Sequence, residues 1–361
     1  MLTIVAFVIV LGVLIFVHEL GHFITAKLAG IAVPRFSIGL GPKIWGFRVG
    51  ETEYVISALP LGGYVKMTGM GEDEAIEALE GGADDLDVPP ERRFDAKSVP
   101  VRAAVISAGV VMNFLFAVVV FAGLIQQRGA LQPVVDVVFE GSHAEQAGLR
   151  PGDQIVAVDS LEISQAGRFG RYIQDKGEGL ITITVEREGQ RLELATRVGS
   201  VIRVDNETGD TTIYEGIGIQ WDTTRRLPVG LVESAVGGWS DAVGWSGLIL
   251  RYIGELFVGK ASFRDLGGPI TIGQLSGQAA RAGVGPLFYF MAVLSVNLAI
   301  LNLLPVPILD GGHLVFLAIE AVRGRALSLE TRARASQVGL IFILALMVWA
   351  LTSDFLRISG N

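Results

Sequence analysis

The sequence contains no cysteine, and only 18% of its residues are charged. Without cysteine there are no disulfides and no thiolate ligands, so any metal site must use histidine and carboxylate side chains. Half of the residues are hydrophobic, which is too apolar for an ordinary soluble protein of 361 residues. The net charge of −8 argues against a nucleic-acid partner. Together these shortages point to a membrane protein.

The apolar residues are concentrated in long uncharged stretches. They cover Met1–Val17, Ala103–Gln127, Ala282–Leu309 and Ala335–Ser353. Each approaches or exceeds the roughly 20 residues with which a helix crosses a bilayer. We therefore predict transmembrane helices within 1–28, 100–127, 282–309 and 334–353. No Lys or Arg precedes Lys27 and no small-residue cleavage site follows, so the first stretch is not expected to be a signal peptide.

Positive charges predict the orientation of these helices. Lys and Arg gather between the first two stretches and again between the third and fourth, at Lys27, Arg35, Lys43, Arg48, Lys66, Arg92, Arg93, Lys97, Arg102, Arg323, Arg325, Arg332 and Arg334. Loops rich in Lys and Arg stay in the cytoplasm. We predict a multi-pass protein of the cytoplasmic (inner) membrane, surrounded by lipid, with its long central segment outside the cell membrane.

The first apolar stretch runs into Val17-His18-Glu19-Leu20-Gly21-His22. Residues four apart share one helix face, so His18 and His22 can offer two imidazoles to one metal ion. Glu19 is then placed to take a proton from a water molecule. This His-Glu-x-x-His pattern is typical of zinc hydrolases. Burying ionisable side chains at membrane depth costs free energy, so such residues are usually functional. The alternative is that these side chains only make hydrogen bonds inside a packed helix bundle, and it is disfavoured for this reason.

A third ligand is expected where the third stretch breaks. Pro305 and Pro307 cannot continue a regular helix, and irregular backbone at membrane depth is tolerated only beside a polar site or enclosed by protein. Asp310 follows this break. Its carboxylate would complete a zinc ligand set of two imidazoles and one carboxylate, with a fourth position left for water. His313 is the competing ligand, and a purely structural Asp310 that caps the next helix is the other alternative.

The region 29–70 is predicted to be a membrane-associated β-hairpin, with strands at 44–49 and 52–57 around Gly50-Glu51. Its free edge could receive an extended substrate as an added strand. The alternative is a cytoplasmic hairpin with no substrate role. The region 71–99 contains an acidic run and is predicted to be a cytoplasmic loop.

The region 131–200 has short strand-like runs separated by glycine, and is predicted to be a compact α/β domain on the outer side. Through Gly148–Asp153 and Gln154–Val158 it resembles a bacterial PDZ domain, a fold that receives peptides by strand addition. His143 is expected to be a surface residue. Region 201–281 is predicted to add strands and then helices that lie along the membrane or against the bundle.

Taken together, these motifs resemble the site-2 protease family, in its bacterial regulator-of-sigma-E protease (RseP) branch. The resemblance rests on His18-Glu19-x-x-His22, Leu59–Met67, Gly109–Asn113, the PDZ-like segment, Gly268-Pro269-Ile270 and Asn302–Gly312. It implies a polytopic helical protein with four transmembrane helices and one zinc ion held by His18, His22 and Asp310, with Glu19 as the catalytic carboxylate.

The same resemblance implies a substrate-binding set: Asn302, Asn113, Pro305, Pro307, Gly62 and Gly63. The implied substrates are single-pass membrane proteins, such as an anti-sigma factor already cut by another protease or remnant signal peptides. The best-known members carry two PDZ domains, whereas this chain has room for one. That domain either contacts periplasmic tails or excludes bulky substrates.

Two rival functions stay open at this stage. One is a zinc metallopeptidase that acts on soluble peptides beside the membrane, which the depth of the motif disfavours. The other is a catalytically idle scaffold that binds peptide tails, which the presence of His18, Glu19, His22 and Asp310 together disfavours.

Overall fold

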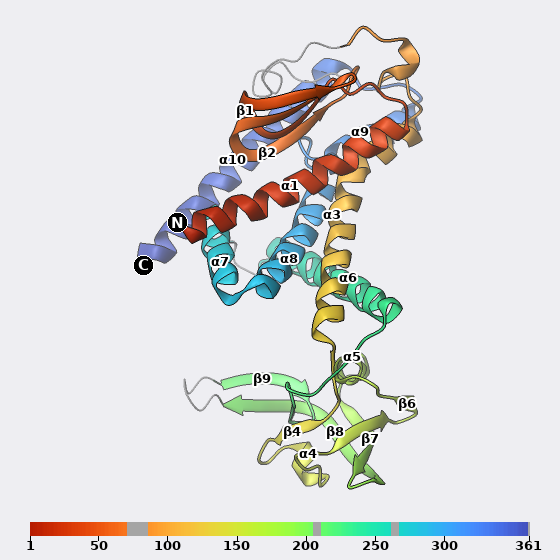
Figure 1. Cartoon of the computed structure of the whole chain (residues 1–361), viewed down its shortest axis with the longest axis vertical. Helices are drawn as coiled ribbons and strands as arrows, with labels where there is room; N and C mark the ends of the chain where they lie inside the picture. The colour runs from red at the N-terminus through yellow and green to blue at the C-terminus, as the bar shows by residue number, and fades with distance from the viewer. Residues whose placement is uncertain (71–85, 205–210, 261–266, 360–361) are drawn as a thin grey trace. The chain divides into compact units, whose positions relative to one another are not determined.

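The computed structural model describes residues 1–70, 86–204, 211–260 and 267–359. The chain divides into two compact units (Figure 1). One, here called the helical unit, comprises Met1–Ala122 and Ala235–Asn361. The other, here called the strand unit, comprises Gly123–Ser234.

Four helices of the described chain are long and apolar enough to cross a membrane. They are α1 (Leu2–Leu28), α3 (Val99–Arg128), α8 (Val284–Leu303) and the part Glu330–Leu356 of α10 (Leu329–Ser359). The prediction of four membrane-spanning helices is thereby supported, and the chain is a mostly helical, multi-pass membrane protein.

Helix α1 ends at Leu28, as predicted, and the His-Glu-x-x-His pattern lies inside it. Helix α8 ends at Leu303 instead of Leu309, because Leu304, the residue before Pro305, takes an extended conformation (φ −62°, ψ 144°). A residue that precedes proline is sterically biased away from the helical region. The break lies where the prolines predict it, and the helix ends six residues before the predicted limit at 309.

The other helices of the helical unit are α7 (Pro269–Ala282), α9 (Asp310–Arg323), the 3-10 turn η1 (Pro90–Arg92) and most of α6 (Leu231–Phe257). The N-terminus of α7 is held by the buried Asp354 of α10, which accepts hydrogen bonds from the backbone N–H groups of Gly268, Ile270 and Thr271. This carboxylate satisfies N–H groups that a helix start would otherwise leave without a partner.

Strands β1 (Arg35–Val49) and β2 (Thr52–Lys66) pair around the turn at Gly50-Glu51. Both strands are longer than the predicted 44–49 and 52–57. The extra residues of β1 pair twice, because Arg35–Ile38 lie opposite Glu53–Ile56 on one side and opposite Gly63–Lys66 on the other. The residues Gly63–Lys66 thus form an edge of this sheet, which packs against the C-terminal half of α1 (Figure 1).

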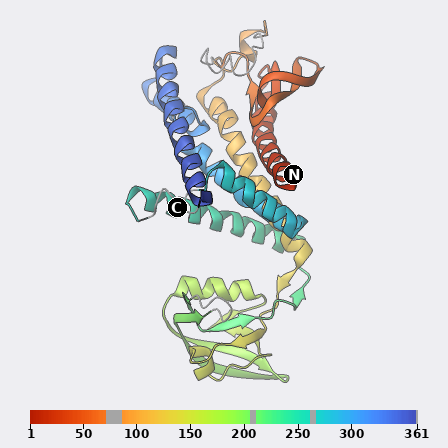
Figure 2. The same ribbon diagram turned by 90° about the vertical axis from the view of Figure 1, so that its left-hand side faces the viewer.

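The strand unit contains a sheet of strands β6, β5, β7, β8 and β9, in that order. They are β5 (Gln154–Val158), β6 (Leu161–Glu162), β7 (Gly179–Arg187), β8 (Gln190–Val204) and β9 (Thr211–Gly216). Helix α5 (Ala166–Lys176) lies across one side of these strands (Figure 2), with Phe169 and Ile173 buried in the same core as Ile155 and Ile183.

Smaller pairs join β10 (Ile219–Trp221) to β4 (Val135–Val138) and β11 (Arg226–Leu227) to β3 (Ala130–Leu131), and α4 (His143–Gln146) follows β4. Because β8 pairs with β9 and β4 with β10, residues beyond 200 belong to the same compact unit. The compact unit therefore extends past the boundary that the sequence suggests. The predicted acidic loop falls largely on 71–85, which lie outside the described residues.

A buried ion pair joins α3 to α9. Arg102 donates to Glu320 from both terminal guanidinium nitrogens, and the two side chains are 9% and 12% exposed. Arg332 of α10 lies 3.6 Å from the same carboxylate. The Arg102 guanidinium, which donates hydrogen bonds to Glu320, holds the pKa of Glu320 below its usual range. The pair helps to place α9, which begins at Asp310, against α3.

We expect Glu320→Gln to lower the free energy of unfolding by about 3–5 kcal/mol at neutral pH, because it leaves the Arg102 charge buried without an anionic partner. The loss should be full above pH ~4.3, the unfolded pKa of glutamate, and disappear as pH falls through the lower folded pKa. Thermal unfolding in detergent at several pH values measures it. The exposed pair Glu330–Arg334 supplies the control: Glu330→Gln should cost at most about 0.5 kcal/mol. Equal effects of both variants would contradict this account.

Candidate metal centre

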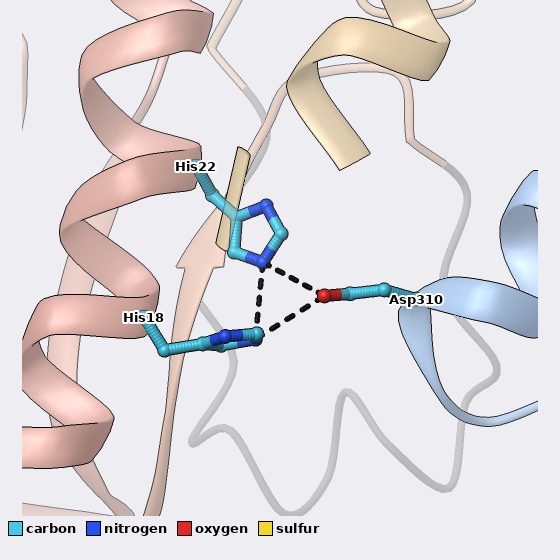
Figure 3. A group of neighbouring side chains, drawn as sticks. All are labelled: His18, His22 and Asp310. Carbon is cyan, nitrogen blue, oxygen red and sulfur yellow. Dashed lines mark hydrogen bonds and ion pairs between the residues drawn. The ribbon is translucent and has the colours of Figure 1, made fainter. Parts of the chain in front are cut away.

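Three predicted ligands lie together in the helical unit. His18 and His22 stand one turn apart on α1, and Asp310 is the first residue of α9. His18 Nε2 and His22 Nε2 are 3.2 Å apart, and they lie 3.3 Å and 3.4 Å from Asp310 Oδ2 (Figure 3). Residues nearly 300 positions apart in the sequence thus present three ligand atoms to one point.

The spacing of these atoms fits a small tetrahedral cation. With metal–nitrogen and metal–oxygen distances of roughly 2.0–2.1 Å, the ligand atoms of a tetrahedral zinc site lie about 3.3 Å from one another. All three separations agree with that value. Asp310 Oδ2 is buried and forms no hydrogen bond in the described part of the chain, so its lone pairs are free for a cation. The residues therefore fit zinc.

His313, the competing ligand, is not part of this cluster among the described residues. It lies one turn into α9, and its ring packs edge to face on Phe316, with ring centroids 6.0 Å apart. The structure therefore brings Asp310, rather than His313, to the two histidines.

The break after α8 explains how Asp310 reaches α1. The segment that contains Pro305 and Pro307 folds back over the first turn of α9, where Gly311 and Gly312 follow Asp310. A Cβ atom on Gly311 would lie 2.3 Å from the carbonyl oxygens of Leu303 and Leu304, and one on Gly312 would lie 2.2 Å from that of Val306. Only glycine permits this approach. The two glycines thus fix the path of the chain that delivers Asp310.

Helix α3 contacts both histidine rings. His22 Nδ1 lies 2.9 Å from the carbonyl oxygen of Val105, and Asn113 Nδ2 lies 3.3 Å from His18 Nδ1. A Cβ atom on Gly109 would lie 2.3 Å from His22 Nε2 and 2.6 Å from His18 Cε1. Residues 105, 109 and 113 follow at helical spacing, so one face of α3 holds both imidazoles.

In the sequence, Gly109–Asn113 served as part of the family resemblance, which implied a substrate contact for Asn113, and Val105 was not identified. Val105 contacts His22 through its backbone carbonyl, a group that every residue type has, so the sequence could not have identified it. The spacing of Gly109 and Asn113, four apart on an apolar helix, was the available signal for a shared face.

Glu19 and the glycines of β2 lie close together. A Cβ atom on Gly63 would lie 3.0 Å from Glu19 Cγ and 2.9 Å from Ile15 Cγ2. The edge strand of the β1–β2 sheet thus passes directly beside Glu19. Among the described residues, nothing holds the Glu19 carboxylate through a hydrogen bond or an ion pair. Glu19 is available to a water molecule or a substrate.

The remaining predicted substrate residues differ in accessibility. Asn302 is half-buried near the end of α8, and Pro305 and Pro307 follow it in the break. Gly62 lies in β2 with φ +83°, a conformation that favours glycine. Asn113 is completely buried and faces His18, so the structure gives a substrate no access to its side chain.

Comparisons with known proteins show the family to which the chain belongs. The model of Peptidase family M50 matches residues 6–346. Relatives named "Putative zinc metalloprotease" include one from Agrobacterium fabrum, 38% identical over 99% of this chain and 96% of the relative. One from Rhizobium meliloti is 37% identical over 98% of this chain and 96% of the relative, and one from Rickettsia conorii is 34% identical over 98% of both. The chain therefore belongs to peptidase family M50, the site-2 protease family, and is a site-2-type zinc metalloprotease of the membrane.

Proposed function

We propose that this protein is an intramembrane endopeptidase of the RseP branch, with one zinc ion held by His18, His22 and Asp310. It hydrolyses peptide bonds within the transmembrane segments of single-pass proteins after another protease has made a first cut. The observation that carries the proposal is the convergence of three ligand atoms, 3.2–3.4 Å apart, two of them on α1, a helix long and apolar enough to cross a membrane.

The catalytic roles follow from the positions of the side chains. When bound, zinc would polarise the scissile carbonyl and lower the pKa of a water molecule toward about 7. Glu19 takes a proton from the attacking water on its carboxylate and passes it to the nitrogen of the leaving amine. The new C–O bond forms first, and the C–N bond then breaks as the amine leaves with that proton. One carboxylate thus serves as base and then as acid.

Substrate recognition is proposed to use the edge of β2. A transmembrane helix keeps its carbonyl groups in internal hydrogen bonds, so the substrate must unwind before it can be cut. Strand pairing with the edge at Gly62 and Gly63 would offset the lost helical hydrogen bonds. The proximity of Gly63 to Glu19 supports this, since a strand added there would run past the carboxylate. Asn302, Pro305 and Pro307 would line the other side.

The strand unit is proposed to be a single PDZ domain. Strand β10 pairs with β4 on one side, and no other described strand pairs with it. Helix α5 is near, since Phe169 packs edge to face on Trp221 of β10, with ring centroids 5.4 Å apart. An open strand edge beside a helix is where a PDZ fold accepts a peptide tail. The domain either binds such tails or excludes substrates with bulky outer domains.

The proposed topology follows the Lys and Arg distribution. The connections around β1, β2 and α9 face the cytoplasm, and the PDZ domain lies outside the inner membrane. The cytoplasmic half of α1 then carries the metal centre. An anti-sigma factor-like protein or a remnant signal peptide is the substrate class that this orientation suits.

Metal analysis tests the proposal against the idle scaffold. Detergent-purified protein should contain one equivalent of zinc, and His18→Ala and Asp310→Ala should each remove most of it while the chain remains folded. His143→Ala serves as the matched control, because His143 belongs to the strand unit and is not one of the clustered ligand residues. A wild-type protein that binds no zinc under these conditions would favour the scaffold.

A further inference from the structure

Asn113 is a buried amide in direct contact with a metal ligand. It belongs to α3, has no exposed surface, and places its amide nitrogen 3.3 Å from His18 Nδ1. Its own backbone carbonyl accepts a hydrogen bond of 2.8 Å from Ser295 of α8. Asn113 is therefore held through its backbone by Ser295, contacts His18 through its side chain, and has no exposed surface.

The second histidine shows what such a partner does. His22 Nδ1 lies 2.9 Å from the Val105 carbonyl oxygen, which can only accept a hydrogen bond. His22 Nδ1 must therefore carry the proton, which leaves the lone pair of Nε2 free and pointed at Asp310. A hydrogen bond of this kind fixes both the tautomer and the ring orientation of a metal-binding histidine.

His18 needs the same arrangement, because its Nε2 also points at Asp310 Oδ2. Its Nδ1–H then requires an acceptor, which the amide nitrogen of Asn113 cannot be. A half-turn about the Asn113 Cβ–Cγ bond exchanges the amide oxygen and nitrogen without moving any other atom. In either orientation one end of the amide lacks a partner, as Oδ1 does here. The unpartnered atom therefore does not distinguish the two amide orientations. The orientation with the amide oxygen toward His18 Nδ1 follows from the metal-binding role of His18.

We propose that Asn113 is a positioning residue for His18, whose Nδ1–H donates to the Asn113 amide oxygen. The inference rests on the proposed function, in which His18 binds zinc through Nε2. It replaces the expected substrate contact of Asn113 with a role in holding the ligand. Helix α3 then orients both histidines, one through the backbone at Val105 and one through the side chain at Asn113.

The test is zinc affinity, measured by chelator competition on the full chain in detergent. Asn113→Leu keeps the approximate size of the side chain and removes the hydrogen bond, so we expect zinc binding 10- to 100-fold weaker. Asn113→Asp keeps an acceptor and removes the donor, so its affinity should stay within threefold of wild type or become tighter. Ser295→Ala, which removes only the bond to the Asn113 backbone, should change the affinity less than threefold.

Each result bears on a different claim. A folded Asn113→Leu protein with wild-type affinity would overturn the inference, as would a variant whose substrate KM rises while its zinc affinity does not change. If the leucine variant does not fold, the aspartate variant decides: a loss of tenfold or more would show that the amide donates to His18. Absence of zinc from the wild-type protein would instead contradict the proposed function.

Discussion

Glu19→Gln should reduce the rate of peptide hydrolysis by about 10²–10⁴-fold, the usual contribution of a general acid–base group. A glutamine amide has nearly the size of the carboxylate but cannot take a proton from water. The measurement is kcat on a single-pass model substrate with wild-type and variant proteins purified side by side.

Zinc content is the control for this variant. Glu19 is not among the clustered ligand atoms, so the variant should retain one equivalent of zinc and the thermal stability of wild type. A variant that keeps its zinc and loses less than tenfold in rate would show that another group moves the proton. A variant that loses its zinc would show that Glu19 helps to hold the metal.

Gly109→Ala should abolish zinc binding, with a loss of at least 100-fold in affinity. The added methyl group would lie 2.3 Å from His22 Nε2 and 2.6 Å from His18 Cε1, closer than carbon atoms approach imidazoles. Both rings are held in place, His22 by Val105 and His18 by Asn113, so neither can move aside without losing its partner. Chelator competition measures the loss.

Gly123→Ala provides a matched control on the same helix. A Cβ atom at Gly123 meets nothing within 4 Å, and alanine is favoured over glycine in a helix by about 1 kcal/mol. That variant should bind zinc normally and be as stable as wild type or more so. If Gly109→Ala also binds zinc normally, α3 does not hold the histidines as closely as the structure shows.

The metal-binding residues could be predicted because short local sequence patterns identify them. His18 and His22 lie four apart on a helix, which places both imidazoles on one face whatever the tertiary fold. Asp310 was expected from the proline break, since irregular backbone in an apolar stretch is tolerated only beside a polar site or enclosed by protein. What brings Asp310 to α1, the fold of 303–309 over Gly311 and Gly312, depends on contacts between distant segments and could not be read from spacing.

The interior support of the site was largely missed for a similar reason. The Val105 carbonyl and the Arg102–Glu320 pair act across 83 and 218 positions, and neither has a sequence pattern of its own. The sheet was predicted in part: alternation around Gly50-Glu51 indicated two strands, but the second pairing of Arg35–Ile38 depends on the chain folding back. That pairing is what places Gly63 beside Glu19.

The most direct measurement is the position of the cut in a single-pass model substrate, found by mass spectrometry of the products. Wild-type protein with zinc should cut within the apolar segment of the substrate, and chelator or Glu19→Gln should remove that product. Helix-destabilising residues introduced into the segment should increase the yield. Zinc-dependent cuts confined to the soluble parts of the substrate would contradict intramembrane proteolysis and favour a metallopeptidase that acts beside the membrane.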